Sequence, residues 1–264
     1  MPEVRERCPA WAPPLLAVQF LTRLPVPGTA SLSPTVVHVG LGRAVAWFPL
    51  VGALVGAITA GIALAGHQLW PAFVAVPLAL ALEARLTGAF HEDAVADFCD
   101  AFGGGHAPDD VRRIMKDSRI GSYGALGLVL ALLLRAALMI ALLSSLPPVA
   151  AGVAIIASAT FGRLLAVGVM TVVPPAASPG LARDVAANVG WPTLMFACVT
   201  ALPGLLAYGL AAPTRLAITV ALAAVFVAWF RRLLLRRIGG STGDCLGFAA
   251  YVGQLLLLLA AAAR

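Results

Sequence analysis

Residues 124–173 read GALGLVLALLLRAALMIALLSSLPPVAAGVAIIASATFGRLLAVGVMTVV. Arg135 and Arg163 are its only ionisable residues, and the pair Pro147-Pro148 divides it into two apolar runs. Each run is longer than the roughly 20 residues with which an α-helix crosses a bilayer. A helix satisfies every backbone hydrogen bond within its own segment, so it is the form that such a run takes in lipid. The stretch therefore predicts two membrane-spanning helices.

The rest of the chain has the same character. Of the 264 residues, 61% are hydrophobic and 11% are charged, whereas about a quarter of the residues of a soluble domain are charged. Residues 15–24 are too few to cross and are expected to lie at the membrane interface or to re-enter. We predict an all-α, polytopic transmembrane helical bundle of about seven spans (six to eight), forming one integral-membrane domain over residues 1–264. The other predicted spans are residues 44–65, 70–82 with an extension towards 90, 193–211, 216–230 and 246–263.

The basic residues predict the orientation of the bundle. They exceed the acids by 18 to 12, but they are scattered among the spans and form no stripe, so binding to nucleic acid is not expected. With the N-terminus in the cytoplasm, the outer connections hold only Arg215 and Arg264. Such an excess is typical of cytoplasmic connections, so we expect a protein of the bacterial cytoplasmic (inner) membrane whose long polar segments face the cytoplasm. The inner segments hold 13 of the 18 basic residues: Arg5, Arg7, Arg23, Arg43, Arg112, Arg113, Lys116, Arg119, Arg183, Arg231, Arg232, Arg236 and Arg237.

Acidic residues gather in the cytoplasmic segment 83–123. Asp93, Asp97 and Asp100 are spaced i, i+4 and i+7, which places them on one face if the helix of the second span continues inward. Like charges at this spacing repel, and a divalent cation would relieve the repulsion. Oxygen ligands without thiolate favour Mg²⁺ or Mn²⁺; the alternative is a solvated acidic face. His91 is a ligand, an acid–base group or an interfacial hydrogen-bonding residue. Eight of the 12 acids lie here: Glu83, Glu92, Asp93, Asp97, Asp100, Asp109, Asp110 and Asp117.

Two further polar stretches lie on the same predicted face. The stretch 112–124 combines cations with hydroxyl, carboxylate and glycine residues: Arg112, Arg113, Lys116, Asp117, Ser118, Arg119, Gly121 and Gly124. Such a mixture suits an anionic, metal-chelated substrate such as a pyrophosphate, although anchoring of the third span explains some of its charges. The Gly-rich loop 239–247 contains Thr242, Gly243 and Asp244. It resembles a phosphate-binding loop in kind but is not a Walker A motif, and a flexible turn is the alternative.

Arg163 and Arg135 lie inside predicted spans, where an arginine is costly unless it is paired. The partner of Arg163 is expected to be a carboxylate or the anionic substrate. We also expect the acidic segment and the Gly-rich loop, far apart in the chain, to form one site, because each lies at the mouth of a span on the same face.

Taken together, these motifs resemble cobalamin synthase, the adenosylcobinamide-GDP ribazoletransferase family. The residues that carry the resemblance are His91-x-Asp93-x3-Asp97-x2-Asp100, the stretch MKDSRIGSYG at 115–124 and Gly240-x-Thr242-Gly243-Asp244-x-Leu246-Gly247. The opening stretches QFLTRLPVP at 19–27 and Arg43-x4-Phe48-Pro49-x2-Gly52 also look like that family. The chain departs from the family pattern at Ala94 and Ala101, where glycine is usual, and at Tyr251 and Gln254, where acidic residues occur in the family.

The resemblance implies the last assembly step of the coenzyme B12 nucleotide loop. A ribose hydroxyl of α-ribazole, or of its 5′-phosphate, would attack the cobinamide-linked phosphorus of adenosylcobinamide-GDP and displace GMP, with Mg²⁺ as cofactor. Asp93, Asp97 and Asp100 would hold the metal, and one of them, or His91, would handle the proton. Substrate contacts would come from Arg112, Lys116, Asp117, Ser118, Arg119, Gly121, Thr242, Gly243 and Asp244.

Two other functions stay open at this point. A CDP-alcohol-type membrane phosphotransferase also uses clustered aspartates at the end of a span, but its D-x2-D-G-x2-A-R spacing is absent. A cation transporter using clustered carboxylates would place acids at the midpoints of spans, whereas these acids gather at one surface. The expected partners are small-molecule substrates and membrane lipid, with a homo-oligomer left open.

Overall fold

In a computed structural model that describes residues 8–176, 185 and 189–263, the regular structure is helical, with one isolated β-bridge between Pro175 and Ser241. Six helices of the described chain are long and apolar enough to cross a membrane, or seven if one bent pair counts as a span. The predicted all-α membrane bundle is thus confirmed. Arg5, Arg7, Arg183 and Arg264, which entered the charge pattern, lie outside the described residues.

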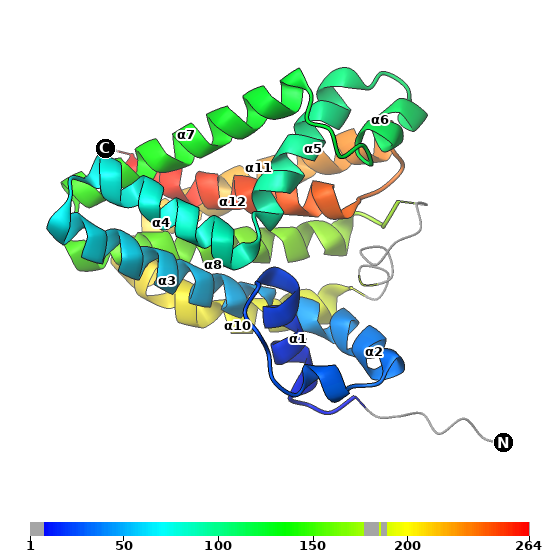
Figure 1. Cartoon of the computed structure of the whole chain (residues 1–264), viewed down its shortest axis with the longest axis horizontal. Coiled ribbons are helices and arrows are strands. Elements are labelled where there is room, and N and C mark those ends of the chain that lie inside the picture. The colour runs from blue at the N-terminus through cyan, green and yellow to red at the C-terminus, as the bar shows by residue number, and fades with distance from the viewer. Residues whose placement is uncertain (1–7, 177–184, 186–188, 264) are drawn as a thin grey trace.

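Figure 1 shows how the helices follow one another along the chain. Their bounds are α1 Ala12–Leu21, η1 Thr29–Ser31, α2 Pro34–Ala44, η2 Val45–Trp47, α3 Phe48–Leu69, α4 Ala72–Thr87, α5 Phe90–Gly104, α6 Pro108–Ile114, α7 Ser122–Ser145, α8 Pro148–Val172, α10 Trp191–Ala211, α11 Pro213–Arg237 and α12 Gly243–Ala262.

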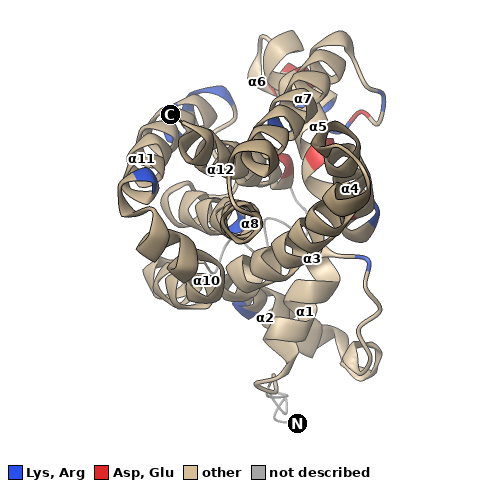
Figure 2. Ribbon diagram, turned by 90° about the vertical axis from the view of Figure 1, so that its left-hand side faces the viewer, with Lys and Arg blue, Asp and Glu red and all other residues tan. Residues whose placement is uncertain are grey.

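Helix α8 occupies the centre of the bundle (Figure 2), where α3, α10 and α12 pack against it. Small residues make this close packing possible. A Cβ added at Gly52 of α3 would overlap the carbonyl oxygen of Ala159, and Gly253 of α12 lies against Gly162. Membrane helices associate through such small-residue contacts, because lipid gives apolar side chains no reason to leave it.

The first span is longer than its apolar run predicted. Helical structure continues from residue 34 through α2, η2 and α3, and the candidate span is Pro34–Leu69. Pro34 at the start of α2 lacks only an N–H that would be unsatisfied in any helix, and Ser33 caps this helix by accepting a hydrogen bond from Val36 N–H. The N-terminal helix α1 has 10 residues, which agrees with the prediction that this segment does not cross.

The second span does not continue unbroken into the acidic segment, whose aspartates lie on a separate helix, α5. Helices α4 and α5 meet at an angle of 90°. The break occurs at Gly88 and Ala89, whose φ angles of 72° and 57° are left-handed and incompatible with a continuing helix. Arg23 fixes this corner, since its N–H donates to the Leu86 carbonyl at 2.7 Å and its guanidinium lies where a side chain on Gly88 would be.

Most of the polar segments meet at one end of the bundle. The end of α5, helix α6, the N-termini of α7 and α12 and the C-terminus of α11 all lie at the right of Figure 1. The corner after α4 turns α5 towards this end and against α7 and α12. The fold thereby brings the acidic segment to the start of the last helix, although the two are far apart in sequence.

Candidate functional site

Helix α5 carries the predicted row of aspartates in three different environments. Asp93 is exposed, Asp97 is half-buried and Asp100 is buried. Asp93 and Asp97 form no ion pair with any residue that the structure describes. They are one helical turn apart and therefore face the same side.

Asp244, in the first turn of α12, lies on the same side as this pair. Gly247, one turn further on, packs directly against Ala94 of α5. A side chain at position 247 would overlap Ala94, so this glycine lets α12 approach the helix that carries Asp93 and Asp97. Asp93 and Asp244 line one cavity of about 280 Å³, which we call the Asp93–Asp244 cavity. The structure thus brings the two predicted polar segments together.

The electrostatics of Asp97 reflect this crowding. Burial raises the pKa of Asp97 to about 6, and the negative charges of Asp93, Asp244 and Asp100 contribute to the increase. A carboxyl group with a raised pKa is one whose ionised form lacks compensation. A cation bound between these groups would supply that compensation.

Asp100 has backbone partners that the sequence pattern did not predict. Its two carboxylate oxygens accept hydrogen bonds from the N–H groups of Gly121 (2.6 Å) and Gly124 (2.7 Å) at the start of α7. A Cβ on either glycine would overlap this carboxylate. The anion that these glycine amides bind is thus a carboxylate of the protein itself. Asp100 thereby holds the N-terminus of α7, where a negative charge is favourable.

The predicted phosphate-binding cations are largely paired within their own segment. Arg112 bonds to Asp109 (3.0 Å) and to the carbonyl of Ile238 (3.0 Å). Arg119 bonds to Asp117 at 2.7 Å, and the hydrogen bonds from Arg119 lower the pKa of Asp117 to about 2. Lys116 is exposed and has no ion pair among the described residues. None of the three cations, nor Ser118, lines the Asp93–Asp244 cavity.

The basic stretch and the Gly-rich loop are neighbours, as expected. Thr242 caps α12 by accepting a hydrogen bond from Cys245 N–H (3.4 Å), and its hydroxyl contacts the sulfur of Met115 at 3.0 Å. The loop is held from the other side by the β-bridge to Pro175, and a side chain at Gly240 would overlap this segment. Gly243 and Asp244 then open into the cavity.

The interior of the cavity contains groups that the motifs did not reveal. Phe20 of α1 stacks on Phe48 of α3 at 5.6 Å and meets Phe90 of α5 edge to face at the same distance. His91 is buried and lines the cavity next to this aromatic cluster, as does Arg163 of α8. Phe20 and Phe48 belong to the two opening stretches that carry the family resemblance, which was the one available signal for them.

A second buried polar cluster holds the middle of the bundle together. Arg135 of α7 bonds to both carboxylate oxygens of Glu83 on α4, at 2.7 and 2.8 Å, and lies 3.6 Å from Glu92. Thr59 of α3 donates a hydrogen bond to Glu83 at 2.8 Å. The Tyr251 ring, 5.6 Å from the Arg135 guanidinium carbon, completes the surroundings. The partner that the buried Arg135 requires is therefore a carboxylate, that of Glu83.

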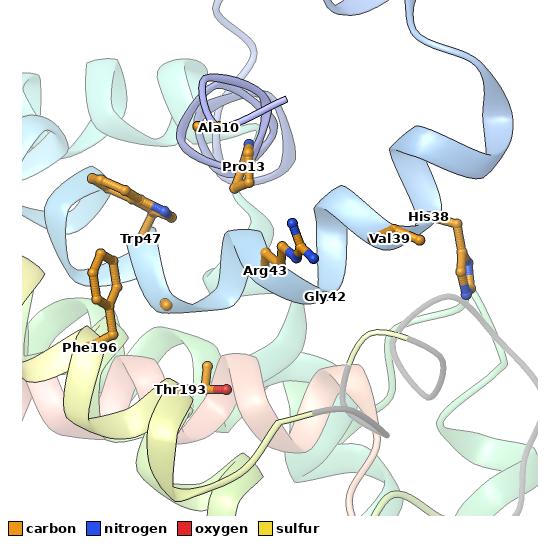
Figure 3. A pocket seen from close by; sticks show the side chains of 10 residues that line it. Ala10, Pro13, His38, Val39, Gly42, Arg43, Trp47, Thr193 and Phe196 are labelled. Carbon is orange, nitrogen blue, oxygen red and sulfur yellow. The ribbon is translucent and has the colours of Figure 1, made fainter. Parts of the chain in front are cut away.

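A larger cavity of about 620 Å³ lies between α1, α2 and α10 (Figure 3). Trp47 and Phe196 meet edge to face in it at 5.4 Å, and Arg43 and His38 extend from α2. It has no carboxylate among its described lining residues. It therefore lacks the groups that would bind a cation and a phosphorylated ligand together, and the Asp93–Asp244 cavity is the candidate site.

The described residues contain no group of three His, Cys, Asp or Glu side chains placed to hold a metal ion. A preformed three-carboxylate site from Asp93, Asp97 and Asp100 is thus not seen, because Asp100 is turned to the α7 amides. Mg²⁺ does not require one, since it is commonly held by one or two carboxylates together with substrate phosphates. Asp93 and Asp97 fit that requirement.

The fold and the site define a polytopic helical membrane protein with a small, largely apolar cavity. Two carboxylates that have no ion pair among the described residues, Asp93 and Asp244, line this cavity. The chain belongs to the cobalamin-5-phosphate synthase family, whose model matches residues 13–262. The resemblance read from the motifs is therefore confirmed.

Curated relatives match over nearly the whole chain. A protein of Ralstonia pickettii named adenosylcobinamide-GDP ribazoletransferase is 39% identical, with 94% of each chain covered. Proteins of the same name from Ralstonia nicotianae and Leptothrix cholodnii are 40% and 38% identical, covering 98% and 91% of this chain and 96% and 93% of theirs. No solved structure matches.

Proposed function

We propose that this protein joins adenosylcobinamide-GDP to α-ribazole or its 5′-phosphate and releases GMP, with Mg²⁺ as cofactor. Membership of the cobalamin-5-phosphate synthase family and the names of the relatives support the reaction. The observation in the structure that best fits it is a cavity lined by Asp93 and Asp244, with Asp97 close enough for both charges to raise its pKa. None of the three carboxylates has an ion pair among the described residues.

Asp93 and Asp97 are the residues that would hold Mg²⁺. They lie one turn apart and have no cationic partner among the described residues, and burial together with the neighbouring carboxylates raises the pKa of Asp97. When bound, the metal would neutralise charge on the pyrophosphate oxygens. Asp100 would contribute by keeping α5 against the N-terminus of α7.

The transfer needs alignment more than covalent work by the protein. The attacking ribose hydroxyl forms a bond to the cobinamide-linked phosphorus, the bond from this phosphorus to the GMP oxygen breaks, and the hydroxyl proton must be taken up. Asp244 lines the cavity from α12 while Asp93 lines it from α5, so Asp244 is placed to accept that proton. Lys116, exposed and unpaired beside the Gly-rich loop, would attract the phosphate groups.

The size and lining of the cavity favour the smaller substrate. A volume of about 280 Å³ lies at the lower limit of pockets for drug-sized ligands and suits a nucleoside better than a corrin ring. The aromatic cluster of Phe20, Phe48 and Phe90 offers faces against which a benzimidazole can stack. The corrinoid would then lie outside, with its pyrophosphate at the aspartates.

The protein of this proposal lies in the bacterial inner membrane with the site facing the cytoplasm, as the basic asymmetry indicates. The paired charges support the transferase over a cation transporter, since Glu83, a fully buried acid, is neutralised by Arg135. A single cysteine introduced at Asp109 should react with membrane-impermeant reagents only from the cytoplasmic side. Labelling from the periplasm would reverse the orientation.

The test of the function uses the purified full-length protein in lipid bilayers. GMP release should be observed with adenosylcobinamide-GDP and either α-ribazole or its 5′-phosphate, and chelation of Mg²⁺ should stop it. Omission of the nucleophile separates transfer from hydrolysis. If no GMP appears with either nucleophile at saturating Mg²⁺, the proposed reaction is wrong.

A further inference from the structure

Arg163 is a buried cation that has no ion pair among the described residues, although the charges of Glu83 and Glu92 act on it from a greater distance. Its side chain is 1% exposed, yet no carboxylate of the described chain lies within ion-pair distance. Among the described residues, its guanidinium donates a hydrogen bond from Nη1 to the Ala159 carbonyl one turn back, at 3.3 Å, and its Nε has no partner. An unpaired charge inside a membrane bundle is costly and marks a binding site more often than a structural one.

Arg163 lines the Asp93–Asp244 cavity from α8. Gly162 packs against the backbone of Ala250 and the side chain of Gln254, so Arg163 lies at the level of the second and third turns of α12. Ala250 follows Asp244 by six residues, or about 9 Å along a helix axis. Arg163 therefore lines the cavity on the membrane side of the aspartates, and it forms no ion pair with either Asp93 or Asp244.

The cavity thus has carboxylates at one end, a guanidinium at the other and aromatic walls between. A ligand that fits this arrangement is a small aromatic molecule with one anionic group at the inner end and a hydroxyl near the carboxylates. Phosphate is the anion that a guanidinium binds best, through two parallel hydrogen bonds.

We propose that Arg163 binds the 5′-phosphate of the nucleotide that enters this cavity, and so makes the enzyme discriminate between α-ribazole 5′-phosphate and α-ribazole. The inference rests on the proposed function. The base lies against Phe20, Phe48 and Phe90, and the ribose hydroxyl faces Asp244. Arg163 is then a specificity-determining residue: it contacts the substrate away from the reacting phosphorus.

The competing source of phosphate is the pyrophosphate of adenosylcobinamide-GDP, and the two sources give different kinetics. We compare the wild type with Arg163→Gln, Arg163→Lys and a control, Arg232→Gln, which removes an exposed arginine from the same end of the bundle. All are measured as full-length proteins in lipid nanodiscs. The two readouts are GMP release with each nucleophile and the shift in melting temperature caused by each nucleophile alone.

For Arg163→Gln, kcat/KM with α-ribazole 5′-phosphate should fall roughly 30-fold or more, the range expected for loss of hydrogen bonds to a charged group. With α-ribazole it should stay within about threefold of the wild-type value. The larger melting shift that the phosphorylated nucleoside gives the wild type should disappear in Arg163→Gln. Arg163→Lys, which keeps the charge but loses the planar fork, should be intermediate, and Arg232→Gln should match the wild type.

An equal fall with both nucleophiles, accompanied by a raised KM for adenosylcobinamide-GDP, would assign Arg163 to the pyrophosphate and overturn the proposal. Unchanged discrimination in both Arg163 variants would also overturn it. If Arg163→Gln does not insert, the lysine variant alone decides between these outcomes. Failure of the proposed function is a different result, because the wild type would then release no GMP with either nucleophile.

Discussion

Two sets of charged side chains, one buried in the bundle and one lining the Asp93–Asp244 cavity, differ in whether the described residues supply ion-pair partners. Glu83 and Arg135 form a buried ion pair at 2.7 Å, and Thr59 adds a hydrogen bond to it. Asp93 and Asp244 share a cavity with Arg163, and none of the three is paired in the part of the chain that the structure describes.

The difference separates residues that hold the bundle from residues that await a ligand. Removing a charge from water inside a membrane protein is unfavourable, and a partner offsets the cost only when the pair is well bonded. The paired set is complete without substrate. In the proposed function, a cation and a phosphorylated molecule would neutralise the unpaired set. Substitutions in the paired set should then lower stability, and substitutions in the unpaired set should lower activity.

The largest effect is expected from the unpaired carboxylates. Asp93→Asn or Asp97→Asn should lower the rate of GMP release by about a thousandfold or more, because the metal contributes several kcal/mol to the transition state. Protein yield and melting temperature should not fall. Asp109→Asn, which removes an exposed aspartate paired with Arg112, is the matched control. A near-normal rate for Asp93→Asn at limiting Mg²⁺ would show that this row is only a solvated face.

Substitutions in the paired set, Glu83 and Arg135, should lower the stability of the protein rather than its activity alone. Glu83→Gln leaves Arg135 buried without its closest counter-ion, and breaking a buried pair from one side typically costs about 3–5 kcal/mol. The free energy of unfolding in bilayers should fall by that order, and the double variant with Arg135→Gln should recover part of the loss. If the Glu83→Gln protein is stable but inactive, Glu83 takes part in ligand binding rather than in holding the bundle together.

Asp100 belongs to the row of aspartates on α5 by its spacing, but its carboxylate has partners within the protein, as Glu83 has. Asp100→Ala deprives the Gly121 and Gly124 amides of their acceptor, a loss of about 1–3 kcal/mol. Hydrogen exchange at the start of α7 should accelerate, whereas Asp97→Ala should leave it unchanged. If both variants behave alike, Asp100 acts with the metal-binding pair rather than as an anchor.

The sequence predicted the features that depend on composition and on one-dimensional spacing. Long uncharged runs identified the bundle, and the i, i+4 relation put Asp93 and Asp97 on one face of a helix. The expectation that Asp244 shares their site followed from the common membrane face.

What the sequence did not predict depends on contacts between helices. The 90° corner at Gly88 and Ala89 is fixed by Arg23 from a distant segment. The carboxylate of Asp100 bonds to the α7 amides, and not to the site of Asp93 and Asp97, because the fold brings the N-terminus of α7 within hydrogen-bond distance. Glu83 and Arg135 are 52 residues apart, so no local pattern links them.

The smallest expected effect is the loss of folding stability that ionised Asp97 causes when no metal is bound. Without metal, ionised Asp97 is partly buried beside other carboxylates, which raises its pKa from 3.8 to about 6. A carboxyl group whose folded pKa exceeds its unfolded value favours folding when protonated, so this penalty is present above pH 6 and disappears as the pH falls towards the unfolded value. Asp97→Asn should therefore melt slightly higher than the wild type at pH 8 in a chelator and at nearly the same temperature at pH 4.

Added Mg²⁺ should remove this difference in melting temperature at pH 8 by stabilising only the wild type, through binding to the folded state. If the difference in melting temperature changes with neither pH nor Mg²⁺, the neighbouring carboxylates do not destabilise ionised Asp97. Asp97 would then not belong to the unpaired set.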